Sequence, residues 1–285
     1  MSEPLTELAR FSFDWAPNLC DPAHGCDAYH RMWSLVRLIE SDGALPAGAP
    51  FFTREIIAAA RDGRASVLLS GAADSGVMAL AVEGPSAAGL AVEVTALDRC
   101  RTPLEQARLY GAARGVPVRT IQCGLDTIPA GQEADAIIGH SILSFLPDTL
   151  RPAVFAGWAG ALRPGGRVLL SQRLTPEGQS YRRTRPSEQV AKRRAELAAR
   201  LDALGNCPVI AKKSEILDEA ERFWAAQLAG NNVTESQIND LARDAGLVVR
   251  SIDTAPDAVS VSPYMLAHQA IKRPRCEIVL ELPAV

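Results

Sequence analysis

Two features of the chain could bind a nucleotide-like ligand. A turn of small residues, Gly71-Ala72-Ala73-Asp74-Ser75-Gly76, follows the apolar run SVLLSG, and Asp98 ends the apolar run AVEVTALD. Small side chains let a ligand approach the backbone and the N-terminus of the next helix. A carboxylate at the end of a second strand can accept hydrogen bonds from both hydroxyls of a ribose. Together the two features favour an adenosine-containing ligand, a property that NAD-binding proteins share.

A histidine at the end of another apolar run is the candidate for acid–base chemistry. The segment ADAIIGH (134–140) is typical of a buried strand, and Gly139-His140-Ser141 stand at its end. Ligands of open α/β sheets lie beyond the carboxyl ends of the strands, so we expect His140 near the reacting group. There it could take a proton from a hydroxyl or an amine. Bonding to a backbone carbonyl is an equally good interpretation, and many group transfers need alignment rather than a base.

Strands and helices alternate along much of the chain. Apolar runs predict strands at 66–71, 91–98, 116–123, 134–140 and 166–174, with helical segments between them. One predicted helix runs from a Thr53 cap to Gly63, and another is capped by Thr102. This alternation predicts parallel strands joined by crossover helices.

Two further segments do not follow the alternation. Residues 176–233 contain two consecutive predicted helices, and residues 1–50 contain one amphipathic helix that begins near Asp27. A helix at 234–246 and the strands LVVRSIDTA and CEIVLELP close the fold. We therefore predict an N-terminal helical extension at 1–50 and a main domain at 51–285 with a helical insertion at 176–233. Extension and insertion together are expected to form a lid.

With these elements in place, the chain resembles the class I S-adenosylmethionine-dependent methyltransferases over roughly residues 60–285. The family loop acid-x-Gly-x-Gly-x-Gly is similar to LLSGAADSG, whose residues at the four positions are Leu69, Gly71, Ala73 and Ser75. One of the three glycines is kept, and a leucine replaces the acid. The segment ALRPGGRVLL resembles the Leu-x-Pro-Gly-Gly turn before the family's fifth strand. The segment YHRMWSLVRL is similar to an N-terminal helix of an uncharacterised bacterial branch of the family.

The resemblance implies a doubly wound, Rossmann-like sheet of seven strands that is mostly parallel and ends in an antiparallel hairpin. It also implies S-adenosylmethionine as the cofactor and direct in-line methyl transfer, with His140 facing the methyl group. The implied cofactor-binding residues are Gly71, Ala73, Ser75, Asp98, Arg99, Asp126 and Gly139, with Asp126 on the adenine side. Aromatic residues of the lid, together with one serine, are candidates for acceptor binding, although aromatics of this kind often belong to a core. These candidates are Tyr29, Trp33, Ser141, Tyr181 and Trp224.

The acceptor is expected to be a small molecule that is methylated on oxygen or nitrogen. A net charge of -3 gives no reason to expect a nucleic-acid partner. GHSI also stands where DNA amino-methylating enzymes carry an Asp/Asn-Pro-Pro-aromatic motif. One alternative is a catalytically inactive binding subunit, which the degenerate glycine loop favours. Another is an NAD(P)-dependent oxidoreductase, which expects Gly-x-Gly-x-x-Gly. The sequence leaves open whether the protein forms a homodimer.

A local group of potential metal ligands lies near the start of the chain. Cys20, His24, Cys26 and His30 fall close together, but structural zinc sites normally use tighter pairs across a hairpin or finger. We interpret this segment as a loop that runs into a helix, and we predict no metal. Since no apolar run approaches the roughly 18 residues of a membrane span and the N-terminus lacks the pattern of a signal peptide, we expect a cytoplasmic protein without a membrane partner.

Overall fold

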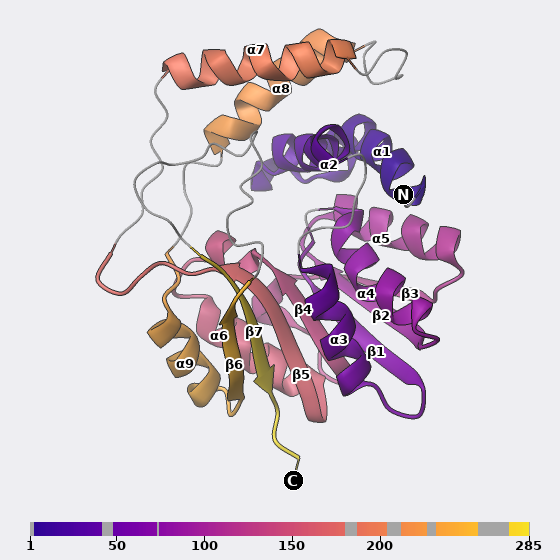
Figure 1. Ribbon diagram of the computed structural model, residues 1–285, viewed down its shortest axis with the longest axis vertical. Helices are drawn as coiled ribbons and strands as arrows, with labels where there is room; N and C mark the ends of the chain where they lie inside the picture. The colour runs from indigo at the N-terminus through magenta and orange to yellow at the C-terminus, as the bar shows by residue number, and fades with distance from the viewer. Residues whose placement is uncertain are drawn as a thin grey trace.

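A seven-stranded sheet forms the centre of the molecule (Figure 1). The computed structural model describes residues 3–41, 48–72, 74–179, 187–203, 212–226, 232–255 and 274–284. The strands are β1 (Arg64–Ser70), β2 (Ala91–Asp98), β3 (Val118–Gln122), β4 (Ala134–His140), β5 (Leu162–Arg173), β6 (Val248–Thr254) and β7 (Arg275–Glu281). Their order across the sheet is β3-β2-β1-β4-β5-β7-β6. Strands β1 to β5 pair in parallel, and β7 runs antiparallel to both β5 and β6. The predicted doubly wound sheet with an antiparallel C-terminal hairpin is confirmed.

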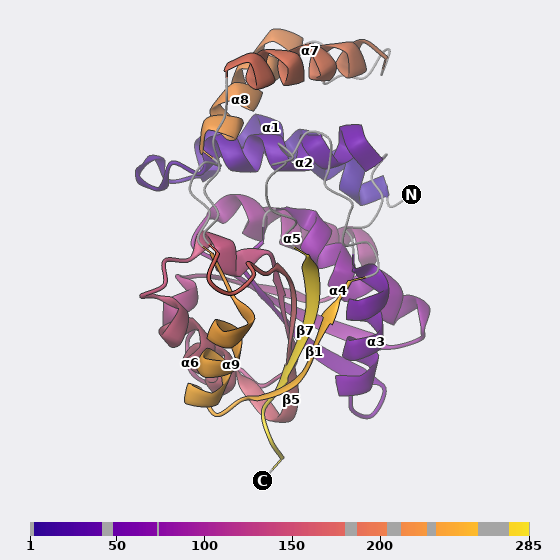
Figure 2. The ribbon, with the colours of Figure 1, turned by 60° about the vertical axis from the view of Figure 1, so that its left-hand side comes forward.

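Helices cover both faces of the sheet, which is why its central strands are nearly continuous apolar runs. One face packs against α3 (Ala49–Ala59), α4 (Ser75–Ala87) and α5 (Arg101–Arg114), and the other against α6 (Arg151–Ala161) and α9 (Glu235–Asp244). Figure 2 shows α3 and α4 on one side of the sheet and α6 and α9 on the other. Successive β1 residues alternate between the two cores: Val67 and Leu69 belong to the first, and Leu68 to the second.

Four helices lie above the edge of the sheet at which β1, β2 and β4 end (Figures 1 and 2). They are α1 (Glu3–Leu19), α2 (Asp27–Ser41), α7 (Ser187–Ala203) and α8 (Lys213–Ala226). We call them the helical cap. They share one apolar core, which contains Phe13, Met32, Leu35, Leu197, Leu201, Ile216, Leu217, Ala220, Phe223 and Trp224. The N-terminal extension and the insertion, which are far apart in the sequence, therefore pack into a single layer.

Several sequence-based boundaries need correction. Helix α1 was not predicted, although Leu8, Ser12 and Ala16 mark a buried stripe at helical spacing. The predicted start of α3 at Thr53 is wrong, because the helix begins at Ala49 with a proline in its first turn. The cap of α5 is Cys100, and Thr102 lies inside the first turn with a fully buried side chain.

Other boundaries agree with the sequence-based predictions. Helix α2 begins at Asp27, and strand β2 ends at Asp98. At the start of α9, Thr234 and Gln237 form a reciprocal capping box. Among the described residues, none of the helices combines the length and apolar character that crossing a bilayer requires.

Candidate functional site

The turn after β1 lies at the carboxyl edge of the sheet and has a backbone that requires glycine. Gly71 has φ +74°, and its N–H donates to the carbonyl of Leu97 in β2 (2.9 Å). A Cβ at Gly71 would lie 2.8 Å from Cδ1 of Ile142, so a larger residue would meet both strain and crowding. Asp74 then caps α4 by accepting a hydrogen bond from the N–H of Gly76 (2.8 Å). The predicted cofactor residue Ala73 lies outside the described residues.

Asp98 is joined to this turn by hydrogen bonds. Its Oδ2 accepts from the N–H of Ala72 (3.0 Å), and its Oδ1 accepts from the N–H of Cys100 (2.7 Å). Burial raises the pKa of Asp98, while these two N–H groups and the nearby His30 act in the opposite direction. Each carboxylate oxygen has a second acceptor position, so the group can still bind two ribose hydroxyls.

Ser75 provides a test of whether a polar ligand fits here. Its side chain is 1% exposed, and within the described part of the chain its Oγ makes no hydrogen bond. A buried hydroxyl without a partner normally costs about 1–3 kcal/mol. A polar group of a cofactor lying along the turn would provide that partner, as S-adenosylmethionine can.

The other predicted cofactor residues are less enclosed. Arg99 and Asp126 are exposed, and Asp126 lies in the short helix η2 (Leu125–Thr127) that follows β3. Cys123, directly after β3, is half-buried, and its pKa is raised by burial and by the charges of Asp98 and Asp126. Asp98 and Asp126 therefore both lie near Cys123, at the ends of β2 and β3.

The end of β4 forms the other half of the site. Gly139 is buried, and a Cβ there would lie 2.7 Å from Cδ2 of Leu170. His140, the last residue of β4, is half-buried, with its ring centroid 6.4 Å from that of Phe52. Ser141 takes a left-handed conformation (φ 58°), which is uncommon for a residue other than glycine. The chain therefore turns sharply beside His140.

Arg275 is a site residue that the sequence interpretation missed. Its Nη1 donates to Oγ of Ser141 (3.1 Å), to Oγ of Ser171 (3.0 Å) and to the carbonyl of Ser171 (3.3 Å). Burial and the neighbouring charge of Arg173 lower the pKa of Arg275 to about 10. Arg173 stands directly opposite Arg275 in the β5–β7 ladder. Only the antiparallel pairing of a strand far along the chain brings these residues to the end of β4.

The predicted acceptor-binding aromatics have different environments. Tyr29 and Trp33 on α2 are half-buried and stacked, with ring centroids 5.7 Å apart. Tyr29 also meets the exposed Phe145 edge-on (5.4 Å), which lies in the short helix η3 (Ile142–Phe145) after β4. Trp224 is 1% exposed and packs inside the cap core. Tyr181 lies outside the described residues. Tyr29 thus connects the cap to the loop beside His140.

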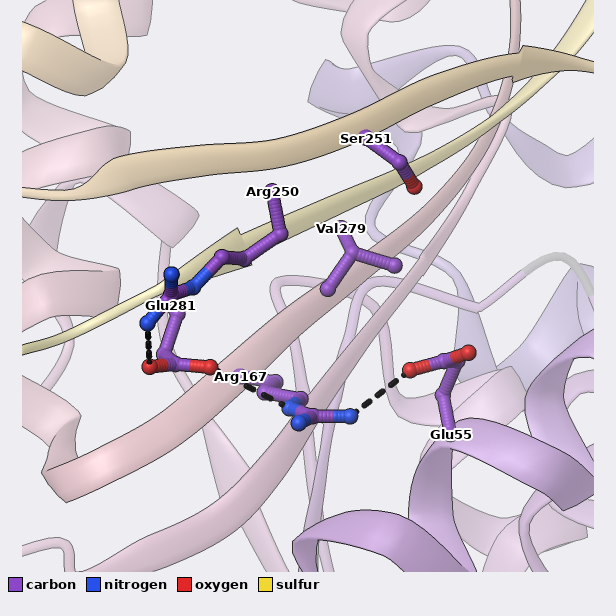
Figure 3. Close-up of a pocket in the computed structure, with 6 residues that line it drawn as sticks. All are labelled: Glu55, Arg167, Arg250, Ser251, Val279 and Glu281. Carbon is purple, nitrogen blue, oxygen red and sulfur yellow. Dashed lines mark hydrogen bonds and ion pairs between the residues drawn. The ribbon is translucent and has the colours of Figure 1, made fainter.

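A separate pocket of about 530 Å³ lies on the face of the sheet between α3 and the strands β5 to β7 (Figure 3). Its charged side chains pair with one another: Arg167 Nη1 lies 2.8 Å from Glu55 Oε2, and Arg167 Nε lies 3.5 Å from Glu281 Oε2. Arg250 also pairs with Glu281. Arg167 lies near the beginning of the β4–β5 pairing and Ser171 lies opposite His140 at its end, so this pocket is remote from the carboxyl edge.

Comparison with known proteins gives a family for part of the chain. Residues 75–166 match the model of a family described as a methyltransferase domain. The match begins at Ser75, near the end of the turn in which the glycines are replaced, and leaves out Gly71 and Ala73. The ubiquinone biosynthesis O-methyltransferase of Proteus mirabilis (strain HI4320) is 34% identical over 88 residues, which are 30% of this chain and 35% of that enzyme. The matched region thus spans about a third of the curated relative.

Solved structures with the same fold cover more of the chain. A geranyl diphosphate methyltransferase in complex with S-adenosylmethionine has a TM-score of 0.53 at 13% identity, over 92% of each chain. The [4+2]-cyclase SpnF has a TM-score of 0.54 at 12% identity, over 83% of this chain and 80% of that one. At these identities the likeness concerns the fold.

Proposed function

Since the chain contains a class I S-adenosylmethionine-dependent methyltransferase domain, we propose that it transfers the methyl group of this cofactor to an oxygen or nitrogen of a small molecule. The observation that carries the proposal is the hydrogen bond from the Ala72 N–H to Asp98. It joins the glycine turn after β1 to the acid that ends β2, which is where an adenosine-type cofactor binds in doubly wound folds.

The cofactor supplies an electrophilic methyl group on a sulfonium sulfur, so the protein has mainly to bind and align. Asp98 would accept hydrogen bonds from the ribose hydroxyls. Ser75 Oγ would donate to or accept from a polar group lying along the turn. Gly71 and Gly139 let the side chains of Ile142 and Leu170 pack directly against the ends of β1 and β4. Asp126 and Arg99 would contribute at the more exposed adenine side.

On the acceptor side, His140 would take the proton that a hydroxyl or amine loses as its methyl bond forms. Ser141, which its turn places next to His140, would orient the acceptor. The helical cap would serve as the lid that keeps water away, with Tyr29, stacked on Trp33, where the cap meets the loop after β4. The contact between Tyr29 and Phe145 supports this role, because it joins the cap to the loop after β4.

The acceptor should carry an anionic group. Arg275 is buried beside Ser141 and stands opposite Arg173 in the β5–β7 ladder. A carboxylate of the acceptor beside Arg275 would accept charge-assisted hydrogen bonds from its guanidinium. The position of Arg275 beside Ser141 would place that group within a small molecule's length of His140.

Cofactor binding tests the central proposal. We expect calorimetry to detect binding of S-adenosylmethionine and none of NAD. Asp98→Ala should weaken cofactor binding by about 1–3 kcal/mol, or roughly 5- to 150-fold, because charge-assisted hydrogen bonds to the ribose are lost. Glu93→Ala, which removes an exposed acid from the same strand, is the control and should bind like the parent. An unchanged dissociation constant in Asp98→Ala would refute the assignment.

The acceptor class needs a separate assay. Phenols and amines can be offered in matched pairs, one member with a carboxylate and the other as its methyl ester, while release of S-adenosylhomocysteine is followed. Turnover should be confined to carboxylates and should require Arg275. The control Arg250→Gln changes an arginine that pairs with Glu281 at the other edge of the sheet. If the methyl esters were turned over as fast as the carboxylates, the acceptor would not need an anionic group, and the proposed methyl transfer would still stand.

A second candidate is a protein that binds the cofactor without transferring its methyl group. The loss of two family glycines from the turn favours it. Tight cofactor binding without methylation of any acceptor offered would favour this candidate.

A further inference from the structure

Four potential metal ligands from four separate segments meet beneath the helical cap. They are Cys20, directly after α1; Cys26, in the loop after the short helix η1 (Pro22–His24); His30 in α2; and Cys100 at the start of α5. Their ligand atoms all lie within 4.8 Å of one another. Three of these residues fall in the segment for which the sequence analysis predicted no metal. The fourth comes from 70 residues further along the chain and replaces His24, which is exposed.

The cluster is buried and its sulfur atoms are close. Exposed fractions are 6% for Cys20, 5% for His30 and 2% for Cys100, and Cys26 is half-buried. The sulfur atoms of Cys20 and Cys100 are 3.3 Å apart. A disulfide requires about 2.05 Å, so the two are not bonded. Four ligand atoms about 2.3 Å from one ion in a tetrahedron stand roughly 3.8 Å apart. The four ligand atoms of this cluster, which all lie within 4.8 Å of one another, therefore have a spacing that fits one ion.

We propose that Cys20, Cys26, Cys100 and His30 bind one structural zinc ion. Three thiolates and one imidazole are an established ligand set for zinc, and four protein ligands leave no open position for catalysis. On binding, the three thiols release their protons to water and His30 binds through a neutral ring nitrogen. The resulting centre has a net charge of -1, from one Zn²⁺ and three thiolates.

Neighbouring groups support this ligand arrangement. Oγ of Thr102 lies 3.2 Å from Sγ of Cys20, where its hydroxyl can donate to a thiolate. The carbonyl of His30 accepts from Oγ of the buried Ser12 on α1, which orients α2. The N–H of Cys100 donates to Asp98. The zinc ligand Cys100 is therefore two residues from, and hydrogen-bonded to, the acid assigned to the cofactor.

The position of the site indicates what zinc would do. Cys20, Cys26 and His30 belong to the cap, whereas Cys100 belongs to the main domain. One ion would link the cap to the main domain beside Asp98, the acid assigned to the cofactor. Loss of the ion should therefore loosen the cap and lower the affinity for S-adenosylmethionine.

The experiment measures metal in the whole 285-residue chain. After expression with zinc and purification without chelators, we expect about one zinc per chain by elemental mass spectrometry. Replacement by cobalt(II) should give the absorption bands of tetrahedral thiolate coordination. Cys26→Ser and His30→Ala should weaken both signals and lose zinc to a weak chelator, while His24→Ala, the neighbouring exposed histidine, should keep them. These readouts need neither acceptor nor activity, so they stand apart from the proposed function.

Three results would overturn the proposal. The first is parent protein without bound metal after expression in excess zinc. The second is metal that Cys26→Ser and His30→Ala retain as firmly as His24→Ala does. The third is an intact mass two hydrogens low that is restored by reductant, with peptide mapping that assigns the disulfide to Cys20 and Cys100. Since Cys26 is half-buried in a loop, its serine variant should fold and keep the test decisive.

Discussion

Gly71 and Gly63 both have positive φ angles, +74° and +72°, yet their surroundings differ. A Cβ at Gly63 would meet nothing within 4 Å, whereas one at Gly71 would lie 2.8 Å from Ile142. A pair of alanine variants therefore separates backbone strain from crowding at the site.

We expect Gly63→Ala to lower the free energy of unfolding by about 1 kcal/mol, since the left-handed conformation disfavours a side chain. Gly71→Ala should lower it by more and should also weaken S-adenosylmethionine binding, because the added Cβ would clash with Cδ1 of Ile142 and the turn would have to shift. Urea unfolding and calorimetry on both variants measure these effects. If Gly71→Ala behaved like Gly63→Ala in both assays, the turn would not be a close-packed binding element.

His140 can be assigned a role by comparing two substitutions. If it is a general base, His140→Ala should lower the single-turnover rate by roughly a hundredfold, with cofactor affinity little changed. The parent's rate should fall in acid, where a protonated imidazole cannot accept a proton, and that fall should vanish in the variant. If His140 only orients the acceptor, His140→Asn should keep much of the rate. If His140→Ala were as fast and as stable as the parent, His140 would not be part of the site.

At the scale of elements, Arg31 joins three cap helices. Its side chain on α2 is 8% exposed, pairs with Glu215 and Glu219 of α8, and donates through Nε to the carbonyl of Phe13 in α1 (3.0 Å). Glu219, whose side chain is 10% exposed, also binds Arg222, which is more than half exposed. The two arginines thus contact the same acid from a buried and an exposed position.

We expect Arg31→Ala to lower the free energy of unfolding by about 3 kcal/mol, since removing one partner of a buried ion pair leaves the other uncompensated. Arg222→Ala should lower it by less than about 1 kcal/mol, as is usual for exposed pairs. Thermal and urea unfolding measure both. Equal effects would mean that Arg222, which also pairs with Asp27 at the start of α2, holds α8 to α2 as strongly as Arg31 does.

On the scale of the whole molecule, the insertion completes a core that begins in the N-terminal extension. Phe223 and Trp224 of α8 pack in the same cluster as Met32 and Leu35 of α2. Removing the insertion would expose this apolar face of α2 but would leave the sheet and the ends of β1 and β2 unchanged.

Deleting residues 178–230 and closing the gap with a short glycine linker should therefore preserve cofactor binding and abolish turnover. Calorimetry and release of S-adenosylhomocysteine measure the two properties, and zinc content reports whether α1 and α2 stay in place. A folded deletion variant with full activity would show that the insertion is not a lid.

What the sequence determined by itself was the alternation of elements. Strands β2 and β4 and the start of α2 were predicted at their observed ends, and Asp98 and His140 were placed at the carboxyl edge. Apolar runs, caps and turn residues are local signals, and right-handed crossovers then leave few arrangements of the sheet.

Only the tertiary structure decided which distant residues meet. Cys100 joins Cys20, Cys26 and His30 because the end of α1 packs against the residues that follow β2. Arg275 reaches Ser141 because β7 enters the sheet antiparallel to β5. Trp224, predicted at the acceptor, lies instead in a core shared by two remote segments. The free energy of such contacts comes from burial between segments far apart in the chain, and a local pattern records that a face is apolar without recording its partner.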